Sequence, residues 1–232
     1  DLDTELVTNE ELSLGCSVPF ARFKIKVKDE IIALKLDKPL DLSFRGVSVP
    51  ASEWDELISQ PDVVLVDTRN DYEVALGSFE GAENPDTQTF RQWPEFVEQN
   101  LKKQQKRKVA MFCTGGIRCE KASSHLLENG YDEVYHLKGG ILNYLEKIQP
   151  EQSKWKGECF LFDHRVSVTH GLTDGEAKLC FGCRWPLQEE DFSSPLYEEG
   201  VSCPRCSNSL SEEKKEKLRE RHKQVELAQK RQ

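Results

Sequence analysis

Three short, continuous apolar runs constrain the fold of this chain more than any other feature. They lie at residues 63–66, 109–112 and 134–137, and a charged residue precedes each of them. Runs of this length without alternation are typical of strands that are buried on both faces of a parallel sheet. The stretches beside them predict helices at residues 52–59, 90–101 and 120–128, with Gly130 ending the last. Strands that alternate with helices imply βαβ crossovers, so we expect an α/β fold with a parallel sheet flanked by helices.

The length of 232 residues predicts two or three domains. The α/β pattern begins near Val49, and after Pro150 the periodicity fades and most of the cysteines follow. We therefore expect three segments, at residues 1–48, 49–150 and 151–232. The chain opens on Asp1 and not on a methionine, which we interpret as a cropped sequence. No apolar run is long enough to cross a bilayer, so we expect no membrane partner.

One of the predicted buried strands is followed by the segment Cys113-Thr114-Gly115-Gly116-Ile117-Arg118-Cys119. Open α/β sheets bind ligands at the carboxyl ends of their strands, so Cys113 lies where a reactive group is expected. The two glycines allow backbone N–H groups to surround an anion, and Arg118 and the next helix N-terminus add positive charge. We predict that Cys113 is a nucleophile with a lowered pKa and that residues 114–118 form an anion-binding loop. Cys119 is either a resolving thiol or a small packing residue.

Two C-x2-C pairs are separated by nineteen residues: Cys180 and Cys183, then Cys203 and Cys206. This spacing is typical of a site in which four thiolates hold zinc. Four protein ligands leave no position for a substrate, so we expect a structural zinc ion; the alternative is free cysteines in a disordered tail. Cys159, His164 and His170 match no ligand spacing, so we expect a core thiol and surface imidazoles.

Charge and cysteine content exclude some functions. The chain has eight cysteines and a net charge of −9 at pH 7. Thiols used as metal ligands and as a reactive group indicate a reducing compartment, so we expect a cytoplasmic protein. The acidic balance argues against broad adhesion to nucleic acid. Basic residues do gather at residues 20–28, in an alternating strand pattern, at residues 102–108, and in a terminal helix at residues 211–232. For each we favour a solvated surface over RNA contact.

The reactive loop resembles that of the rhodanese family, in which a Cys is followed by a short turn with glycine and by an Arg. The likeness spans about residues 49–149 and is supported by Asp67-Thr68-Arg69, by Gly81-Ala82 with Asn84-Pro85, and by Leu137-Lys138-Gly139-Gly140. The resemblance implies a rhodanese-like fold. It also implies that Asp67 and Arg69 stabilise the domain as a charge pair, so that Asp67 is structural and not catalytic.

Longer strings resemble one subgroup, the oxygen-dependent tRNA uridine 5-hydroxylases. They lie at residues 67–73, 84–87 and 113–121, and the likeness continues beyond them from Trp155 to Asp163. That family carries a ferredoxin-like or acylphosphatase-like domain in front, and residues 14–36 resemble its final portion. The resemblance implies hydroxylation of the wobble uridine at C5 in the tRNA anticodon loop, with molecular oxygen as co-substrate and Cys113 as the essential thiol.

A splayed wobble base needs aromatic and basic groups along its approach. The candidates are Tyr72, Phe90, Arg91 and Trp93, each of which is equally a packing or surface residue. Addition of the Cys113 thiolate to C6 of uracil is a hypothesis for the mechanism. No flavin, haem, nicotinamide or non-haem iron motif is found. Two other functions stay open: a sulfurtransferase that carries a persulfide on Cys113, and a noncatalytic docking module.

Overall fold

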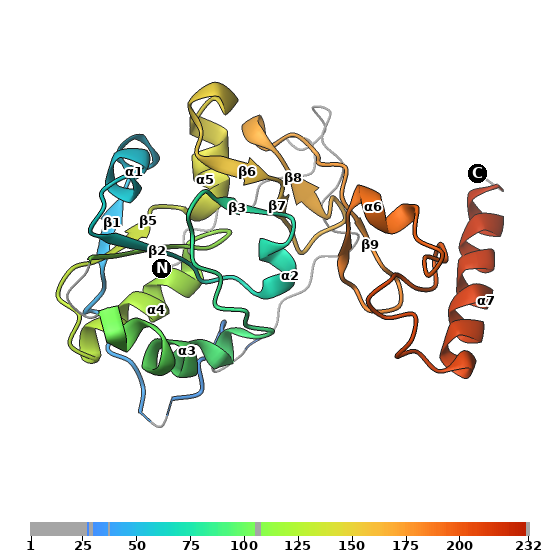
Figure 1. Cartoon of the computed structure of the whole chain (residues 1–232), viewed down its shortest axis with the longest axis horizontal. Coiled ribbons are helices and arrows are strands. Elements are labelled where there is room, and N and C mark those ends of the chain that lie inside the picture. The colour runs from blue at the N-terminus through green and yellow to red at the C-terminus, as the bar shows by residue number, and fades with distance from the viewer. Residues whose placement is uncertain (1–26, 28–29, 37, 105–107, 231–232) are drawn as a thin grey trace.

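The computed structural model describes residue 27 and residues 30–36, 38–104 and 108–230 (Figure 1). Its main sheet has four strands in the order β1-β5-β4-β2, and all neighbouring strands are parallel. These strands are β1 (Val47–Val49), β2 (Val63–Asp67), β4 (Lys108–Phe112) and β5 (Val134–Leu137). The predicted buried strands and the α/β class are therefore confirmed. Of the predicted basic strand at residues 20–28, all but Val27 lies outside the described residues.

Each face of the sheet has its own core because side chains alternate along the strands. Helices cover both faces (Figure 1): α3 (Trp93–Gln99) and α4 (Ile117–Glu128) one, and α1 (Ala51–Ile58) and α5 (Gly140–Lys147) the other. On β4, Val109 and Met111 join the cluster on the α3/α4 face, whereas Ala110 and Phe112 join the cluster on the α1/α5 face. Cys113 continues this alternation and lies in the α3/α4 cluster.

Helix α4 begins earlier than predicted. We expected its start at Glu120, but Gly116 is the N-cap in a left-handed conformation (φ 91°), and the helix begins at Ile117. Only glycine adopts that conformation without strain. Arg118 and Cys119 consequently lie in the first helical turn, where backbone N–H groups have no intrahelical partner.

The other predicted helices match with small differences. The helix at residues 52–59 is α1, and the helix at residues 90–101 is divided into a 3₁₀ turn (Phe90–Gln92), α3 and a second 3₁₀ turn (Leu101–Gln104). The sequence pattern did not predict the short elements α2 (Asp71–Val74) and β3 (Gly77–Phe79), nor helix α5. Of these elements, α2 and α5 contact the loop that follows Cys113.

The core continues across the domain boundary that we predicted at residue 150. Three short strands follow it: β6 (Trp155–Gly157), β7 (Cys159–Phe160) and β8 (Ser167–Val168). Strand β6 pairs antiparallel with β3, and β7 pairs with β8. Trp155, Cys159 and Val168 are buried in the same cluster as Phe112. This part of the C-terminal region therefore packs as part of the α/β core.

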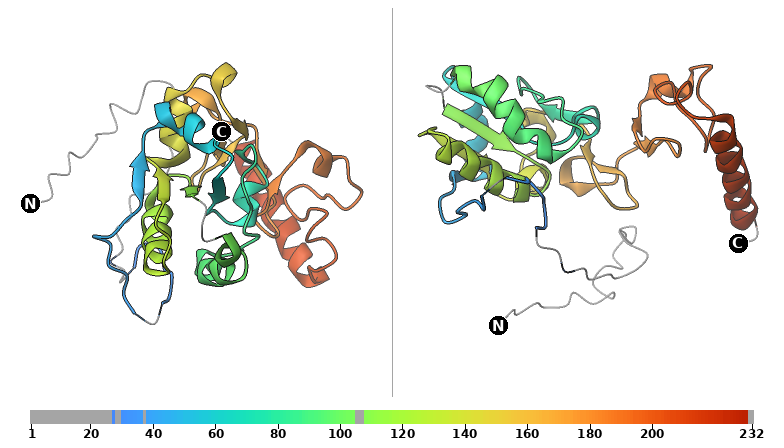
Figure 2. Two further views of the ribbon diagram at one scale, coloured as in Figure 1. Left: turned by 60° about the vertical axis from the view of Figure 1, so that its left-hand side comes forward. Right: turned by 90° about the horizontal axis from the view of Figure 1, so that it is seen from below.

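The rest of the C-terminal region extends away from the sheet, and α7 lies at the far end of the molecule (Figures 1 and 2). It contains β9 (Lys178–Leu179), β10 (Pro186–Leu187), α6 (Glu189–Phe192) and α7 (Glu212–Gln229). The Ser211 hydroxyl caps α7 by accepting a hydrogen bond from the Lys214 N–H at 3.3 Å. This confirms the predicted terminal helix. Among the described residues, no helix combines the length and the apolar composition that a membrane span needs.

Candidate active site and cysteine cluster

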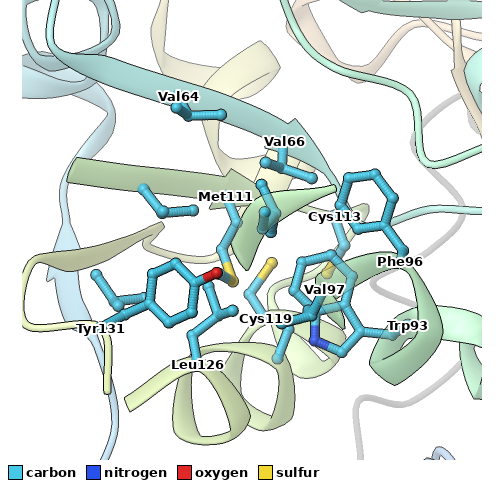
Figure 3. Close-up of a cluster of buried hydrophobic side chains, with 14 of the residues drawn as sticks. Val64, Val66, Trp93, Phe96, Val97, Met111, Cys113, Cys119, Leu126 and Tyr131 are labelled. Atoms are coloured by element: carbon cyan, nitrogen blue, oxygen red, sulfur yellow. The ribbon is translucent and has the colours of Figure 1, made fainter. Parts of the chain in front are cut away.

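The Cys113 thiol lies at the carboxyl end of β4, beneath the loop that leads into α4. Its side chain is only 2% exposed. The Gly116 N–H donates a hydrogen bond to Cys113 Sγ at 3.1 Å. Figure 3 shows Cys113 and Cys119 entering one buried cluster from β4 and α4, beside Trp93 and Phe96. A negative charge on Cys113 would therefore be held by backbone N–H groups in a site from which water is largely excluded.

The pKa values of the neighbouring thiols Cys113 and Cys119 are shifted in opposite directions. A hydrogen bond from the Cys119 side chain, the Arg118 charge and the backbone N–H groups of Cys119 and Arg118 outweigh burial and lower the pKa of Cys113 to about 6. Burial, together with the charge of Cys113, raises the pKa of Cys119 well above its ordinary value. The direction for Cys113 is the one that the sequence predicts. At neutral pH the pair therefore holds one thiolate, on Cys113, and one thiol, on Cys119.

Arg118 does not direct a free guanidinium group at the thiolate. It forms a bidentate ion pair with Glu73, with Nη1 at 2.6 Å from Oε2 and Nη2 at 2.7 Å from Oε1. Thr114 Oγ1 lies within 3.4 Å of both groups. Because the Glu73 carboxylate balances most of the Arg118 charge, an anion at this loop would depend more on backbone N–H groups than we inferred from the sequence.

Glu73 fixes the loop to α2. Its carboxylate is fully buried, and Oε2 also accepts a hydrogen bond from the Asn70 N–H at 3.1 Å. Its backbone carbonyl accepts one from Arg69 Nη1 at 3.3 Å. Arg69 itself forms a buried ion pair with Asp67 at 2.6 Å, so the charge pair implied by the family resemblance is present. Two consecutive ion pairs thus connect the end of β2 to the loop after β4.

The beginning of α5 packs directly on the loop backbone. The Ile141 N–H donates to the Cys113 carbonyl at 3.0 Å, and the Leu142 N–H donates to the Thr114 carbonyl at 3.1 Å. Gly140, with φ of 66°, allows this approach because it has no side chain. The segment at residues 137–140 therefore leads into a helix start that holds the loop backbone by hydrogen bonds.

Replacing Gly140 by Ala is expected to distort the loop. An added Cβ would lie 2.5 Å from the Cys113 carbonyl oxygen and 2.6 Å from that of Thr114. Gly130→Ala is the matched control, since Gly130 also has positive φ (84°) but open space around an added Cβ. We expect each change to cost about 1–2 kcal/mol through the left-handed backbone, and only Gly140→Ala to raise the pKa of Cys113. The pH dependence of Cys113 alkylation measures this, and equal profiles in both variants would contradict the role of Gly140.

The residues that we considered for lining the approach of a base divide into two groups. Phe90 and Trp93 are buried in the α3/α4 cluster, and Arg91 is exposed. Tyr72 lies on α2 and packs edge-on against Phe160, at 5.3 Å between ring centroids. Of the basic run at residues 102–108, Lys102 pairs with Glu98 at 2.5 Å, as expected for a solvated surface.

Four C-terminal thiols lie together. Cys180, Cys183, Cys203 and Cys206 have their Sγ atoms within 4.8 Å of one another. Three of the Sγ–Sγ distances are 3.6, 3.7 and 3.9 Å. Zinc–sulfur bonds of about 2.3 Å in a tetrahedron place neighbouring sulfurs about 3.8 Å apart, so this cluster has the dimensions to hold a metal ion such as zinc.

The remaining candidate ligands lie apart from this cluster. Cys159 is fully buried in the α1/α5 cluster, and burial raises its pKa to about 12. Neither His164 nor His170 belongs to a group of potential metal ligands among the described residues. Cys159 is therefore an inert core thiol, as predicted.

Sequence reasoning missed two residues of the site, Glu73 and Gly140. Glu73 follows Asn70 by three positions, and this spacing is typical of a helix N-cap. The local pattern therefore explains Glu73 without indicating its ion pair with Arg118. Gly140 belongs to the string at residues 137–140, whose only signal in the sequence is its resemblance to the rhodanese family. The close approach that requires a glycine involves Cys113 and Thr114, in another segment of the chain.

Comparison with known proteins finds matches for part of this chain. Residues 50–147 match the family model of the rhodanese-like domain. Similar solved structures include a rhodanese-related protein from Thermoplasma volcanium (24% identity, TM-score 0.37, 45% of this chain and 95% of that chain). Others are reduced Bacillus anthracis CoADR-RHD (24%, 0.38, 46% and 18%) and a rhodanese-like domain protein from Staphylococcus aureus (24%, 0.35, 42% and 90%). The parallel sheet, the thiol loop after β4 and the family match together identify residues 50–147 as a rhodanese-like domain.

Proposed function

We propose that this protein hydroxylates the wobble uridine of tRNA at C5, with Cys113 as the reacting thiol and molecular oxygen as co-substrate. The observation that carries the proposal is the pair of buried thiols, Cys113 and Cys119, which lie in one cluster and of which Cys113 has a pKa lowered to about 6. The resemblance of residues 67–73, 84–87 and 113–121 to the hydroxylases supports the choice of substrate. A wobble base is single-stranded and enters a pocket without the cost of opening a duplex.

Cys113 activates the base by covalent addition. Its thiolate adds to C6 of uracil, and the electron pair of the C5–C6 double bond moves toward C5. C5 then takes up molecular oxygen and a proton as a hydroperoxide, whose O–O bond is cleaved to leave a hydroxyl group on C5. Loss of the C5 proton and departure of Cys113 restore the double bond. In sum, each base consumes one oxygen molecule, two electrons and two protons, and one water is released.

Cys119 is the electron donor that this chain supplies beside Cys113. Its thiol takes the outer oxygen of the hydroperoxide and becomes a sulfenic acid, and the released Cys113 condenses with it to a disulfide and water. The two thiols thus provide both electrons, and a dithiol reductant restores them after each turnover. This proposal assigns Cys119 as a resolving thiol, one of the two roles that the sequence leaves open.

Nucleoside mass spectrometry of tRNA tests the proposed function. A strain that lacks this enzyme is complemented with the full-length protein, with Cys113→Ser or with Cys159→Ser as a matched control for an inert thiol. We expect 5-hydroxyuridine-derived nucleosides to return with the wild type and Cys159→Ser, and to be absent with Cys113→Ser. Return with Cys113→Ser would remove this thiol from the mechanism, and no return with any protein would contradict the hydroxylase.

A sulfurtransferase is the second candidate. The Gly116 N–H and the first-turn N–H groups of α4 that hold a thiolate would hold a Cys113 persulfide equally well. In that case purified protein would transfer sulfur from thiosulfate to cyanide, and Cys113→Ser would abolish the transfer. Sulfur transfer without formation of 5-hydroxyuridine would decide in favour of this candidate.

We infer that the C-terminal cysteine cluster holds a structural zinc ion, because four thiolates close the coordination sphere. Replacing Cys180 by Ser is expected to release the metal and to loosen residues after Leu179, while the rhodanese-like domain stays folded. Metal analysis and hydrogen exchange measure the two effects, and Cys159→Ser, outside the cluster, is expected to keep its metal. Unchanged metal content in Cys180→Ser would contradict the assignment.

A further inference from the structure

A cavity of about 370 Å³ lies between α2, β7 and the segment that follows Cys183. Its main lining residues are Tyr72, Phe160, Phe162, Asp163, Arg184 and Trp185. Small-molecule sites in proteins have volumes of about 300–1,000 Å³ and are lined mainly by apolar and aromatic groups. The cavity therefore has the size and lining of a ligand site, although it does not contain Cys113.

Aromatic rings form the wall of this cavity. Phe160 packs edge-on against Tyr72 on one side and against Phe162 on the other, at 5.3 and 5.2 Å between ring centroids. Phe160 is buried, but Phe162 is 64% exposed. Trp185 adds a ring from the cysteine-cluster side, 6.4 Å from Tyr72. An exposed phenyl ring fixed at the edge of an aromatic wall offers a stacking face for a flat ligand.

The charges around the cavity favour an anionic ligand. Arg184 and Arg205 are exposed, and neither forms a salt bridge within the described part of the chain. The Arg205 guanidinium lies over the Trp185 ring, 3.4 Å from its centroid. The acidic residue in the wall, Asp163, pairs with Arg165 at 2.6 Å. These two guanidinium groups have no salt-bridge partner among the described residues, although the net charge of the chain is −9. They disfavour a bound cation and favour a ligand that carries a phosphate beside a flat ring.

The cavity and the Cys113 loop share one element. Tyr72 and Glu73 are neighbours in α2; Tyr72 lines the cavity, and Glu73 holds Arg118 in the first turn of α4. A strand of RNA with one base at the loop would therefore meet the aromatic wall on the other side of α2.

We propose that this aromatic cavity binds a nucleotide of the substrate RNA by stacking its base on Phe162, with its phosphate at Arg184 and Arg205. The inference rests on the proposed function, because RNA is the substrate there. The stacked nucleotide is a neighbour of the base that reacts at Cys113. The cysteine cluster then has a direct part in recognition, since Arg184 and Trp185 follow Cys183.

A binding experiment with the full chain and an RNA hairpin that has an anticodon loop tests the proposal. Fluorescence anisotropy measures the affinity. Replacing the aromatic ring by alanine removes the stacking interaction with the base. We therefore expect Phe162→Ala to weaken binding about 5- to 100-fold. Phe181→Ala is the control: this ring is also exposed (46%), but it lies between Cys180 and Cys183 and outside the cavity. We expect the control to bind as the wild type does. Equal affinity of Phe162→Ala and wild type would overturn the proposal.

Small probes separate stacking from simple anion binding and from the proposed reaction. We expect uridine monophosphate to bind the wild type more tightly than ribose phosphate does, and to lose this advantage in Phe162→Ala. If Arg184→Gln weakened both probes equally while Phe162→Ala changed neither, the cavity would bind an anion and the stacking proposal would fail. Nucleotide binding that depends on Phe162, in a protein that forms no 5-hydroxyuridine, would uphold the cavity and refute the reaction. Normal hydroxylation with unchanged affinity in Phe162→Ala would uphold the reaction and refute nucleotide binding in the cavity.

Discussion

Iodoacetamide is expected to alkylate Cys113 with a rate that rises through pH 6 and is constant above about pH 7. The thiolate is the reacting form, and the pKa of Cys113 is lowered to about 6. An ordinary cysteine, with a pKa of about 8.5, would hold only a few per cent thiolate at neutral pH, so the Cys113 thiolate population is larger by a factor on the order of thirty. The gain in rate is smaller than this, because nucleophilicity falls with pKa. Peptide mass spectrometry follows Cys113 separately from the other cysteines.

Variants of Cys119 identify the origin of this acidity. Cys119→Ala removes the side-chain hydrogen bond, the largest influence on the pKa of Cys113. A hydrogen bond to a charged group contributes about 1.5–3 kcal/mol, so we expect the midpoint to move up by about 1–2 pH units. Cys119→Ser keeps a donor and should stay closer to the wild type. A midpoint near 6 in Cys119→Ala would show that the Arg118 charge and the backbone N–H groups hold the thiolate without the Cys119 side chain.

Glu73→Ala is expected to be the most destabilising single substitution in the site. It leaves the Arg118 guanidinium buried without its bidentate partner. Breaking a buried ion pair by removing one partner costs about 3–5 kcal/mol, measured as the free energy of unfolding in denaturant.

The double variant Glu73→Gln with Arg118→Met provides the control. It removes both charges, so it should recover most of the stability lost in Glu73→Ala. Glu56→Ala, at an exposed position on α1, should change stability by no more than about 0.5 kcal/mol. A loss in Glu73→Ala as small as that in Glu56→Ala would mean that the ion pair does not support the loop.

The sequence predicts best what depends on local patterns. Uninterrupted apolar runs predict the buried strands β2, β4 and β5. Two C-x2-C pairs predict the cysteine cluster, because this spacing is typical of metal sites. Cys113 could be identified because a strand end, two glycines and a helix start follow each other within a few residues. Each of these signals is complete within one short segment.

The parts that escaped prediction depend on contacts between distant segments. Glu73 meets Arg118 across forty-five positions of sequence. Helix α5 begins at two glycines with positive φ, a start that helix propensity does not indicate. The early start of α4 at Ile117 depends on a left-handed Gly116, whose conformation the loop determines. The catalytic roles of Cys113 and Cys119, the loop at residues 114–118 and the tRNA substrate stay predictions.

The pairing of β6 with β3 has a consequence for how the protein is made. Trp155 lies over the guanidinium of Arg69, 5.1 Å from its ring centroid, and Val168 completes the cluster on the α1/α5 face. Chains leave the ribosome from the N-terminus and fold as their segments emerge. Part of the cluster on the α1/α5 face would thus stay uncovered until the residues up to Val168 have emerged. A nascent chain that pauses before that point would expose Phe79, Phe112 and Tyr144, and this is where a chaperone would be needed.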